Sequence, residues 1–253
     1  MKIEINQKEK SELFVNLFTN LKLITENVNI ECVEDGLYIQ GMDNSQICIY
    51  DLKIDKSWFN VYQCDENSTY GINMNILARI LSVKNENQNI ILYDDNDKLS
   101  IEFLSENKEE INKYFELTLL DIDQEKMGIP DTEYDINIEF KSKTFKTIIN
   151  ELTNFGDELK IYYDENIYLE TSSIESSMKL ELTEDNVEEL TMTEDSETLN
   201  ISFSIKYLYM FSQFHKLNDI VTIGISPEIP IQLKYNLGEN AYCKFYLAPK
   251  ISD

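Results

Sequence analysis

Histidine is almost absent from this sequence, and cysteine is sparse. His215 is the single histidine, and the four cysteines, Cys32, Cys48, Cys64 and Cys243, are scattered and form no C-x-x-C pair. A zinc site needs clustered thiolate or imidazole ligands, so the sequence argues against one. The spacing is typical of reduced, mostly buried thiols in a cytosolic or nuclear protein.

Long hydrophobic runs are missing as well. No stretch of about 18 apolar residues occurs, which argues against a membrane-spanning helix and a membrane partner. Lys2, Glu4, Lys8 and Glu9 interrupt the first residues, so we expect no signal peptide. The 253 residues, 42% of them hydrophobic, suffice for one large domain or two of ordinary size.

Basic residues are outnumbered by acids, 22 to 47, which gives a net charge of −25. Taken alone, this balance argues against a nucleic-acid partner. The charges are unevenly distributed, however, because residues 181–197 carry eight acids and no base. That run is typical of a solvated strand edge and loop, and it leaves the basic residues concentrated elsewhere.

The chain contains an internal repeat with an offset of 130 or 131 residues. Three matches keep one order and one spacing, as two tandem copies of one domain would. The matched pairs are residues 36–40 with 166–170, residues 10–14 with 141–145, and residues 73–77 with 203–207.

Each half reads as strand-rich with two helices, which predicts an α+β fold. Leu13, Phe14, Leu17, Phe18 and Leu21 have helical spacing, and similar stripes lie at 77–81, 145–152 and 205–211. We expect a capping box from Asn6 and Glu9, a helix cap at Asn73 and a helix end at Gly156. Alternating runs at 29–33, 89–93, 99–103 and 179–182 predict strands, with a hairpin turn at 94–97. We expect an N-terminal domain at 1–118, a connector at 119–134, where Gly128 and Pro130 break the pattern, and a C-terminal domain at 135–253.

Ten of the 22 bases lie on or beside the four expected helices. Lysines decorate many exposed helices, but four basic helices in an acidic chain also predict a surface that follows a phosphate backbone without reading bases. The ten are Lys8, Lys10, Lys22, Arg79, Lys84, Lys141, Lys143, Lys146, Lys206 and Lys216.

Six motifs are spread over nearly the whole chain, at residues 36–47, 59–65, 71–74, 79–81, 127–134 and 246–251. The clearest are Gly-Leu-Tyr-Ile-Gln-Gly-Met-Asp at 36–43 and Tyr-Leu-Ala-Pro-Lys-Ile at 246–251. In this order they resemble the motifs of the proliferating cell nuclear antigen (PCNA) family of eukaryotic-type DNA sliding clamps.

The resemblance implies two clamp domains per subunit, each with two helices lining a pore, and three subunits closed into a ring around double-stranded DNA. It implies a processivity factor for DNA polymerase, put on DNA by a clamp loader, with no catalytic residues, no metal and no cofactor. The expected location is the nucleus, or a viral replication compartment if the protein is viral. The subunit contact would pair an edge strand with Phe115 and Leu117 with one bearing Met178 and Leu180.

The family also binds short PIP-box peptides of replication and repair proteins beneath the connector. The resemblance assigns this pocket to Met42, Gln46, Ile47, Ile49, Met127, Ile129, Pro130, Tyr134, Pro230, Tyr246, Ala248 and Pro249. A shallow apolar cup of this kind takes a one-turn helix with aromatic anchors. The alternative is that Met42, Ile47 and Ile49 are ordinary core residues.

Some positions depart from the family pattern, and other functions stay open. Gln46 replaces a histidine, and Asn16, Asn150 and Asn154 lie where many relatives carry a base, so DNA contact would be weaker. The subunit could instead belong to a heteromeric, checkpoint-type clamp or act as a monomeric viral processivity factor. A remote alternative is a Ca²⁺-binding or hydrolytic β-rich protein, since residues 121–125 read D-x-D-x-E.

Overall fold

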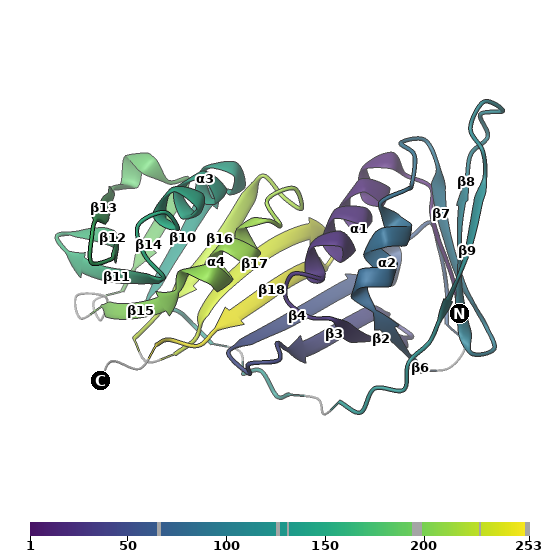
Figure 1. The fold of residues 1–253 in the computed structure, drawn as a ribbon, viewed down its shortest axis with the longest axis horizontal. Coiled ribbons are helices and arrows are strands. Elements are labelled where there is room, and N and C mark those ends of the chain that lie inside the picture. Colours follow the sequence, from purple (N-terminus) through teal and green to yellow (C-terminus); the bar gives the residue numbers. More distant parts are fainter. Residues whose placement is uncertain (65–66, 125–126, 131, 194–198, 228, 251–253) are drawn as a thin grey trace. The chain divides into compact units, whose positions relative to one another are not determined.

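The structure is a computed structural model that describes residues 1–253 except 65–66, 125–126, 131, 194–198, 228 and 251–253. Asp65, Glu125, Asp131 and Ile251, which belong to sequence motifs discussed above, therefore lie outside the described residues, as do Glu194, Asp195 and Glu197 of the acidic run. The first half of the chain contains the following elements (Figure 1): β1 (Lys2–Ile5), α1 (Lys8–Leu21), β2 (Asn27–Val33), β3 (Gly36–Met42), β4 (Cys48–Asp55), η1 (Lys56–Trp58), β5 (Val61–Gln63), β6 (Ser68–Asn73), α2 (Met74–Leu81), β7 (Asn89–Asp95), β8 (Lys98–Leu104) and β9 (Lys113–Thr118).

The second half repeats the first element for element, which confirms the predicted tandem α+β architecture. The offsets also agree: β3 and β12 start 130 residues apart, and α2 and α4 start 131 apart. The elements are β10 (Ile136–Lys141), α3 (Ser142–Leu152), β11 (Glu158–Asp164), β12 (Asn166–Ser172), β13 (Ser177–Leu182), η2 (Glu184–Asn186), β14 (Glu189–Met192), β15 (Asn200–Ser204), α4 (Ile205–Ser212), β16 (Ile220–Ile225), β17 (Ile231–Gly238) and β18 (Ala241–Leu247).

The chain divides into two compact units, and each contains a short segment from the other half of the sequence. Unit 1 comprises 1–44, 50–127 and 237–243, and unit 2 comprises 45–49, 128–236 and 244–253. The first repeat has the strand orders β5-β1-β7-β8-β9 and β4-β3-β2-β6, and the second repeat has the equivalent orders β14-β10-β16-β17-β18 and β13-β12-β11-β15. Next to β18 in the strand order comes β4, and both strands contribute residues to both units.

The helices of each unit pack as a pair, α1 against α2 and α3 against α4 (Figure 1). On α1 the predicted stripe faces inward, since Phe14, Leu17, Phe18 and Leu21 are each at most 3% exposed. Burial of such a stripe, at about 25 cal/mol per Å² of apolar surface, stabilises a short helix that would be marginal in water.

The helix ends confirm one sequence prediction and correct two others. Asn73 caps α2, because its side-chain oxygen accepts a hydrogen bond from the Ile76 N–H at 3.1 Å. The predicted Asn6–Glu9 capping box is wrong: α1 starts one residue later, with Gln7 as N-cap and no side-chain cap. The helix end predicted at Gly156 is also wrong, since α3 ends at Leu152.

No helix among the described residues is long and apolar enough to cross a membrane.

Candidate DNA interface and peptide-docking site

The four helices and their flanks form a basic zone within an acidic chain. Residues 8–22, 74–84, 141–154 and 205–216 together hold all ten predicted DNA-facing bases and three acids, a net charge of +7, whereas the whole chain carries −25. The tertiary structure divides these ten bases into two groups.

Four of the ten are engaged by their own protein. Lys8 pairs with Glu86, Lys10 with Glu239 and Lys141 with Glu188. Glu86 raises the pKa of the Lys8 ammonium by hydrogen bonding and charge. Lys84 is half-buried and donates to the carbonyl of Asn85 at 2.9 Å, and burial lowers its pKa. These partners neutralise or hold cations that the sequence alone assigns to DNA.

Lys10 is the most strongly held of the ten. Its side chain is 15% exposed, and its Nζ lies 2.8 Å from both the Trp58 carbonyl oxygen and a Glu239 carboxylate oxygen. The same ammonium sits 5.5 Å from the centre of the Trp58 ring, within the range of a cation–π interaction. Lys10 therefore stabilises the packing of α1 against η1.

The other six bases form no ion pair with any described residue. Lys22, Arg79, Lys143, Lys206 and Lys216 are exposed, and Lys146 is half-buried. Each helix, or the turn after it, supplies at least one of them. We call these six the available bases, because no described residue forms an ion pair with them.

Two of the asparagines noted above as departures from the family pattern bond to their own helices. The Asn16 amide donates to the Glu12 carbonyl at 2.8 Å, and the Asn154 amide donates to the Asn150 carbonyl at 3.1 Å. Such back-bonding to the preceding turn occupies the amide donors. These asparagines therefore add no charge to the surfaces of α1 and α3.

His215 lies beside two of the available lysines. It follows α4, is half-buried, and its Nδ1 is 3.2 Å from the Gln213 carbonyl oxygen. Burial and the positive charges of Lys146 and Lys216 lower the pKa of His215, so the ring is neutral at pH 7. A phosphate placed among these groups would favour its protonation.

The four predicted interface residues lie on the terminal strands of their sheets. Phe115 and Leu117 belong to β9, which ends the five-stranded sheet of unit 1, and Met178 and Leu180 belong to β13, which ends the four-stranded sheet of unit 2. Their side chains are buried or half-buried, while Tyr114 on β9 is 65% exposed. Among the described residues, β9 and β13 are therefore two of the strands that have a neighbouring strand on one side only.

The twelve predicted peptide-site residues are shared between the units. Met42 and Met127 belong to unit 1 and the other ten to unit 2. Within unit 2 the structure brings some of them together: the Ala248 N–H donates to the Ile47 carbonyl at 3.0 Å, and the Tyr134 hydroxyl donates to the Pro230 carbonyl at 3.3 Å.

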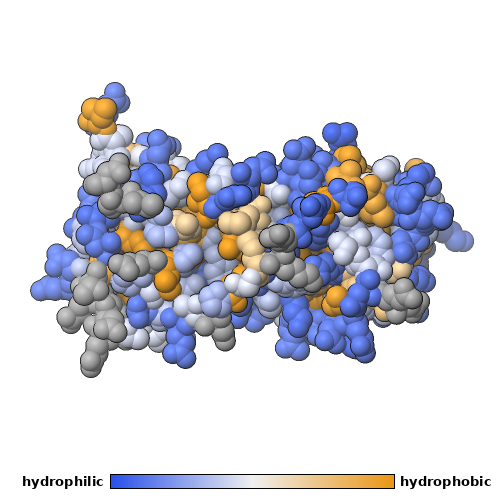
Figure 2. Space-filling model, turned by 90° about the horizontal axis from the view of Figure 1, so that it is seen from below, coloured by the Kyte–Doolittle hydropathy of each residue, from blue (hydrophilic) through white to orange (hydrophobic). Residues whose placement is uncertain are grey.

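These residues differ in accessibility. Gln46, Ile47 and Pro130 are exposed, with Ile47 at 39%, whereas Tyr246 is only 9% exposed and serves mainly as a core residue. Pro230 is exposed as well. The other seven residues are half-buried: Met42, Ile49, Met127, Ile129, Tyr134, Ala248 and Pro249. Figure 2 shows hydrophobic side chains as separate patches on a mostly hydrophilic face.

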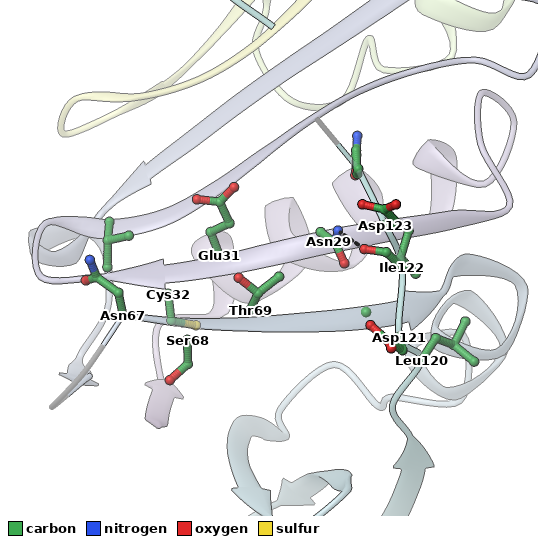
Figure 3. Close-up of a pocket in the computed structure, with 13 residues that line it drawn as sticks. Asn29, Glu31, Cys32, Asn67, Ser68, Thr69, Leu120, Asp121, Ile122 and Asp123 are labelled. Atoms are coloured by element: carbon green, nitrogen blue, oxygen red, sulfur yellow. Dashed lines mark hydrogen bonds between the residues drawn. The ribbon is translucent and has the colours of Figure 1, made fainter. Parts of the chain in front are cut away.

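Unit 1 also contains a polar hollow of about 510 Å³ that the sequence did not predict (Figure 3). Its walls are β2, β6 and the connector segment 120–124, and it exposes the carboxylates of Glu31, Asp121 and Asp123 with no basic residue in the lining. The described residues contain no group of three or more His, Cys, Asp or Glu able to hold a metal ion. Glu125, the third acid of the D-x-D-x-E motif, lies outside the described residues.

The fold and these surfaces define a class of protein: a duplicated clamp with basic helices, free strand edges and a connector that joins the two repeats. Residues 3–126 match the family described as proliferating cell nuclear antigen, N-terminal domain, and residues 128–250 match its C-terminal domain. The sequence is 30% identical over 257 residues to "Proliferating cell nuclear antigen" of Chaetomium thermophilum, covering 97% of each chain. It is 32% identical over 258 residues to "Proliferating cell nuclear antigen 2" of Plasmodium falciparum, covering 96% of this chain and 97% of the relative.

The chain belongs to the proliferating cell nuclear antigen family. It is a DNA sliding clamp that acts as a processivity factor in DNA replication, and it is not an enzyme. Docking of other replication proteins is a general role of this family.

Proposed function

We propose that three copies of this chain close into a ring around duplex DNA by pairing β9 of one copy with β13 of the next. The strand order carries this proposal. By their places in equivalent sheets, β9 is the counterpart of β18 and β13 is the counterpart of β4. Within the chain, β18 already lies next to β4 in the strand order. A β9–β13 pair between copies would therefore be the equivalent pairing of the equivalent strands. Such pairing also removes two open edges that would otherwise promote aggregation.

A closed ring would keep DNA by topology instead of by tight contact. Three subunits of charge −25 would bring −75 to the assembly, with the basic zone of each directed at the phosphates. Six available bases per subunit give a loose, sequence-blind contact, since five of them are lysines, which are mobile point charges, and only Arg79 carries a bidentate fork. This arrangement suits sliding, because strong phosphate contacts would hold the ring in place.

Light scattering at several dilutions tests the ring. A mass near three times 29.7 kDa supports it. A stable monomer would refute it and favour a monomeric processivity factor, and a ring formed only with other clamp chains would favour a heteromeric clamp.

The peptide site is the second part of the proposed function. We assign PIP-box binding to the twelve residues named above, with exposed Ile47 and half-buried Ile129 as its accessible aliphatic contacts. Changing both to alanine should weaken binding of a synthetic peptide of the pattern Q-x-x-hydrophobic-x-x-aromatic-aromatic by about tenfold or more. Tyr246 is unsuitable for this test because its truncation would also open the core. Unchanged affinity with an intact fold would contradict the assignment.

The proposed partners follow from the ring, and the proposed location follows from the relatives. A closed ring needs a clamp loader to reach circular DNA, and DNA polymerase would use the peptide site. Both relatives come from eukaryotes, which supports a nuclear location.

A further inference from the structure

Glycine is scarce in this chain, and three of its seven glycines lie under the connector. Gly71 on β6, Gly41 on β3 and Gly224 on β16 each face a connector residue. A side chain at any of these positions would overlap the connector. Each contact falls within a single unit.

At its start, the connector lies directly on Gly71. The Leu120 N–H donates to the Gly71 carbonyl at 2.8 Å, as an isolated antiparallel bridge. A Cβ on Gly71 would meet the Leu120 carbonyl oxygen well inside van der Waals contact, its carbonyl carbon at 2.9 Å and Ile122 Cδ1 at 3.1 Å. Because two of these atoms are backbone, an added methyl group could be accommodated only by moving the connector.

Further along, three hydrogen bonds hold the connector to the sheet. The Asn29 amide donates to the Ile122 carbonyl at 3.0 Å, as the dashed line in Figure 3 shows. The Gln124 amide donates to the Gln40 carbonyl at 2.7 Å, and the Gln40 side-chain oxygen accepts from the Met127 N–H at 2.9 Å. Met127, a predicted peptide-site residue, is therefore fixed to β3.

At its end, the connector lies on Gly224. A Cβ there would come within 2.5 and 2.6 Å of the Tyr134 ring atoms Cδ2 and Cγ, so the ring can lie on β16 only because residue 224 lacks a side chain. The Tyr134 hydroxyl donates to the Pro230 carbonyl at 3.3 Å, and the Asn137 amide donates to the Tyr134 carbonyl at 3.1 Å. Burial raises the pKa of Tyr134 to about 12, in agreement with this packed position.

We propose that Gly71 and Gly224 are positioning residues of the peptide site: they seat the two ends of the connector and thereby place Met127 and Tyr134 for the partner peptide. The proposal rests on the proposed peptide-docking function. It identifies residues that do not touch the peptide as determinants of its affinity. A connector seated in this way is pre-organised, which lowers the entropy lost when the peptide binds.

Single alanine substitutions test the proposal, and the connector supplies its own control. A Cβ added at Gly128 would meet no atom within 4 Å, and its φ is not positive, so Gly128→Ala should change nothing beyond about twofold. Gly71→Ala and Gly224→Ala should weaken binding of the synthetic PIP-type peptide by about fivefold or more, which matches the loss from one well-packed contact. Amide hydrogen exchange should speed up at Leu120 in Gly71→Ala and at Asp135 in Gly224→Ala, because these N–H groups donate to the Gly71 carbonyl and to the Ser226 hydroxyl.

The exchange rate and the affinity together separate the possible outcomes. Faster exchange with weaker binding in both variants, but not in Gly128→Ala, supports the proposal. Unchanged exchange, or faster exchange with unchanged affinity, overturns it. If the unaltered protein fails to bind the peptide, the docking function falls, while the exchange rates still decide whether the glycines seat the connector. If Gly224→Ala does not fold, adding Tyr134→Ala must restore folding by removing the ring, and failure to do so also overturns the proposal.

Discussion

Lys10 and Lys143 should respond in opposite ways to the same substitution. Both belong to the basic zone, but Lys10 is enclosed by Trp58 and Glu239 whereas Lys143 is exposed on the first turn of α3. Methionine keeps an unbranched apolar stem and removes the charge. Lys10→Met should therefore lower stability and spare DNA binding, and Lys143→Met should do the reverse.

The contacts of Lys10 set the size of the effect. A hydrogen bond from a charged group to a carbonyl is worth about 1.5–3 kcal/mol, the exposed ion pair at most about 1 kcal/mol, and the cation–π contact about 0.5–1 kcal/mol. These contributions overlap because they share one ammonium, so we expect a loss of about 2 kcal/mol. For a chain of this size, that loss corresponds to a Tm lower by about 4–8 °C.

Lys143→Met should change the unfolding free energy by no more than about 0.5 kcal/mol, as is usual for exposed positions. If Lys143 contacts a phosphate, its loss should reduce the slope of log K against log salt by about 0.9. Thermal unfolding and fluorescence anisotropy with a short labelled duplex, at several KCl concentrations, measure both effects. A Lys10→Met variant with unchanged Tm and a reduced salt slope would refute the division of the bases into engaged and available groups.

Three further predictions address the ring, the pH dependence and the connector. Tyr114→Asp should lower the mass measured by light scattering without lowering the Tm of the subunit, since the side chain is 65% exposed on an edge strand; an unchanged mass would argue against β9 as the joint. DNA affinity should rise at acidic pH, below the ordinary histidine pKa of about 6.5, because burial and the neighbouring lysines lower the pKa of His215 and its protonation adds a cation; His215→Gln should remove this rise, and an equal rise in the variant would contradict it. Gln40→Leu should speed hydrogen exchange of the Met127 amide, whereas Gln40→Glu, which keeps an acceptor oxygen, should largely preserve its protection; equal exchange in both would mean that Gln40 does not hold the connector.

Local patterns determined the architecture of this protein. The repeat near 130 residues predicted two copies of one α+β domain, because buried positions recur wherever the same elements recur. The stripe ending at Leu21 and the cap at Asn73 placed two helices, since helical spacing and capping depend on neighbours within four residues. The motif at 246–251, with the others in register, was sufficient to indicate the family.

Contacts between distant segments were beyond the reach of the sequence. The capping box expected at Asn6 failed because the Asn6 N–H instead donates to the side chain of Asn60, 54 residues away. The pairing of Lys10 with Glu239 spans 229 residues, so no local pattern distinguishes this lysine from Lys143.

The sequence by itself determined the duplication, the helices and strands, the basic character of the helix zone and the family. Only the tertiary structure decided which bases are available, which strands end their sheets and which glycines lie under the connector. Periodicity and charge are properties of short segments, whereas the accessibility of a cation or the space above a glycine depends on side chains that folding brings from elsewhere in the chain.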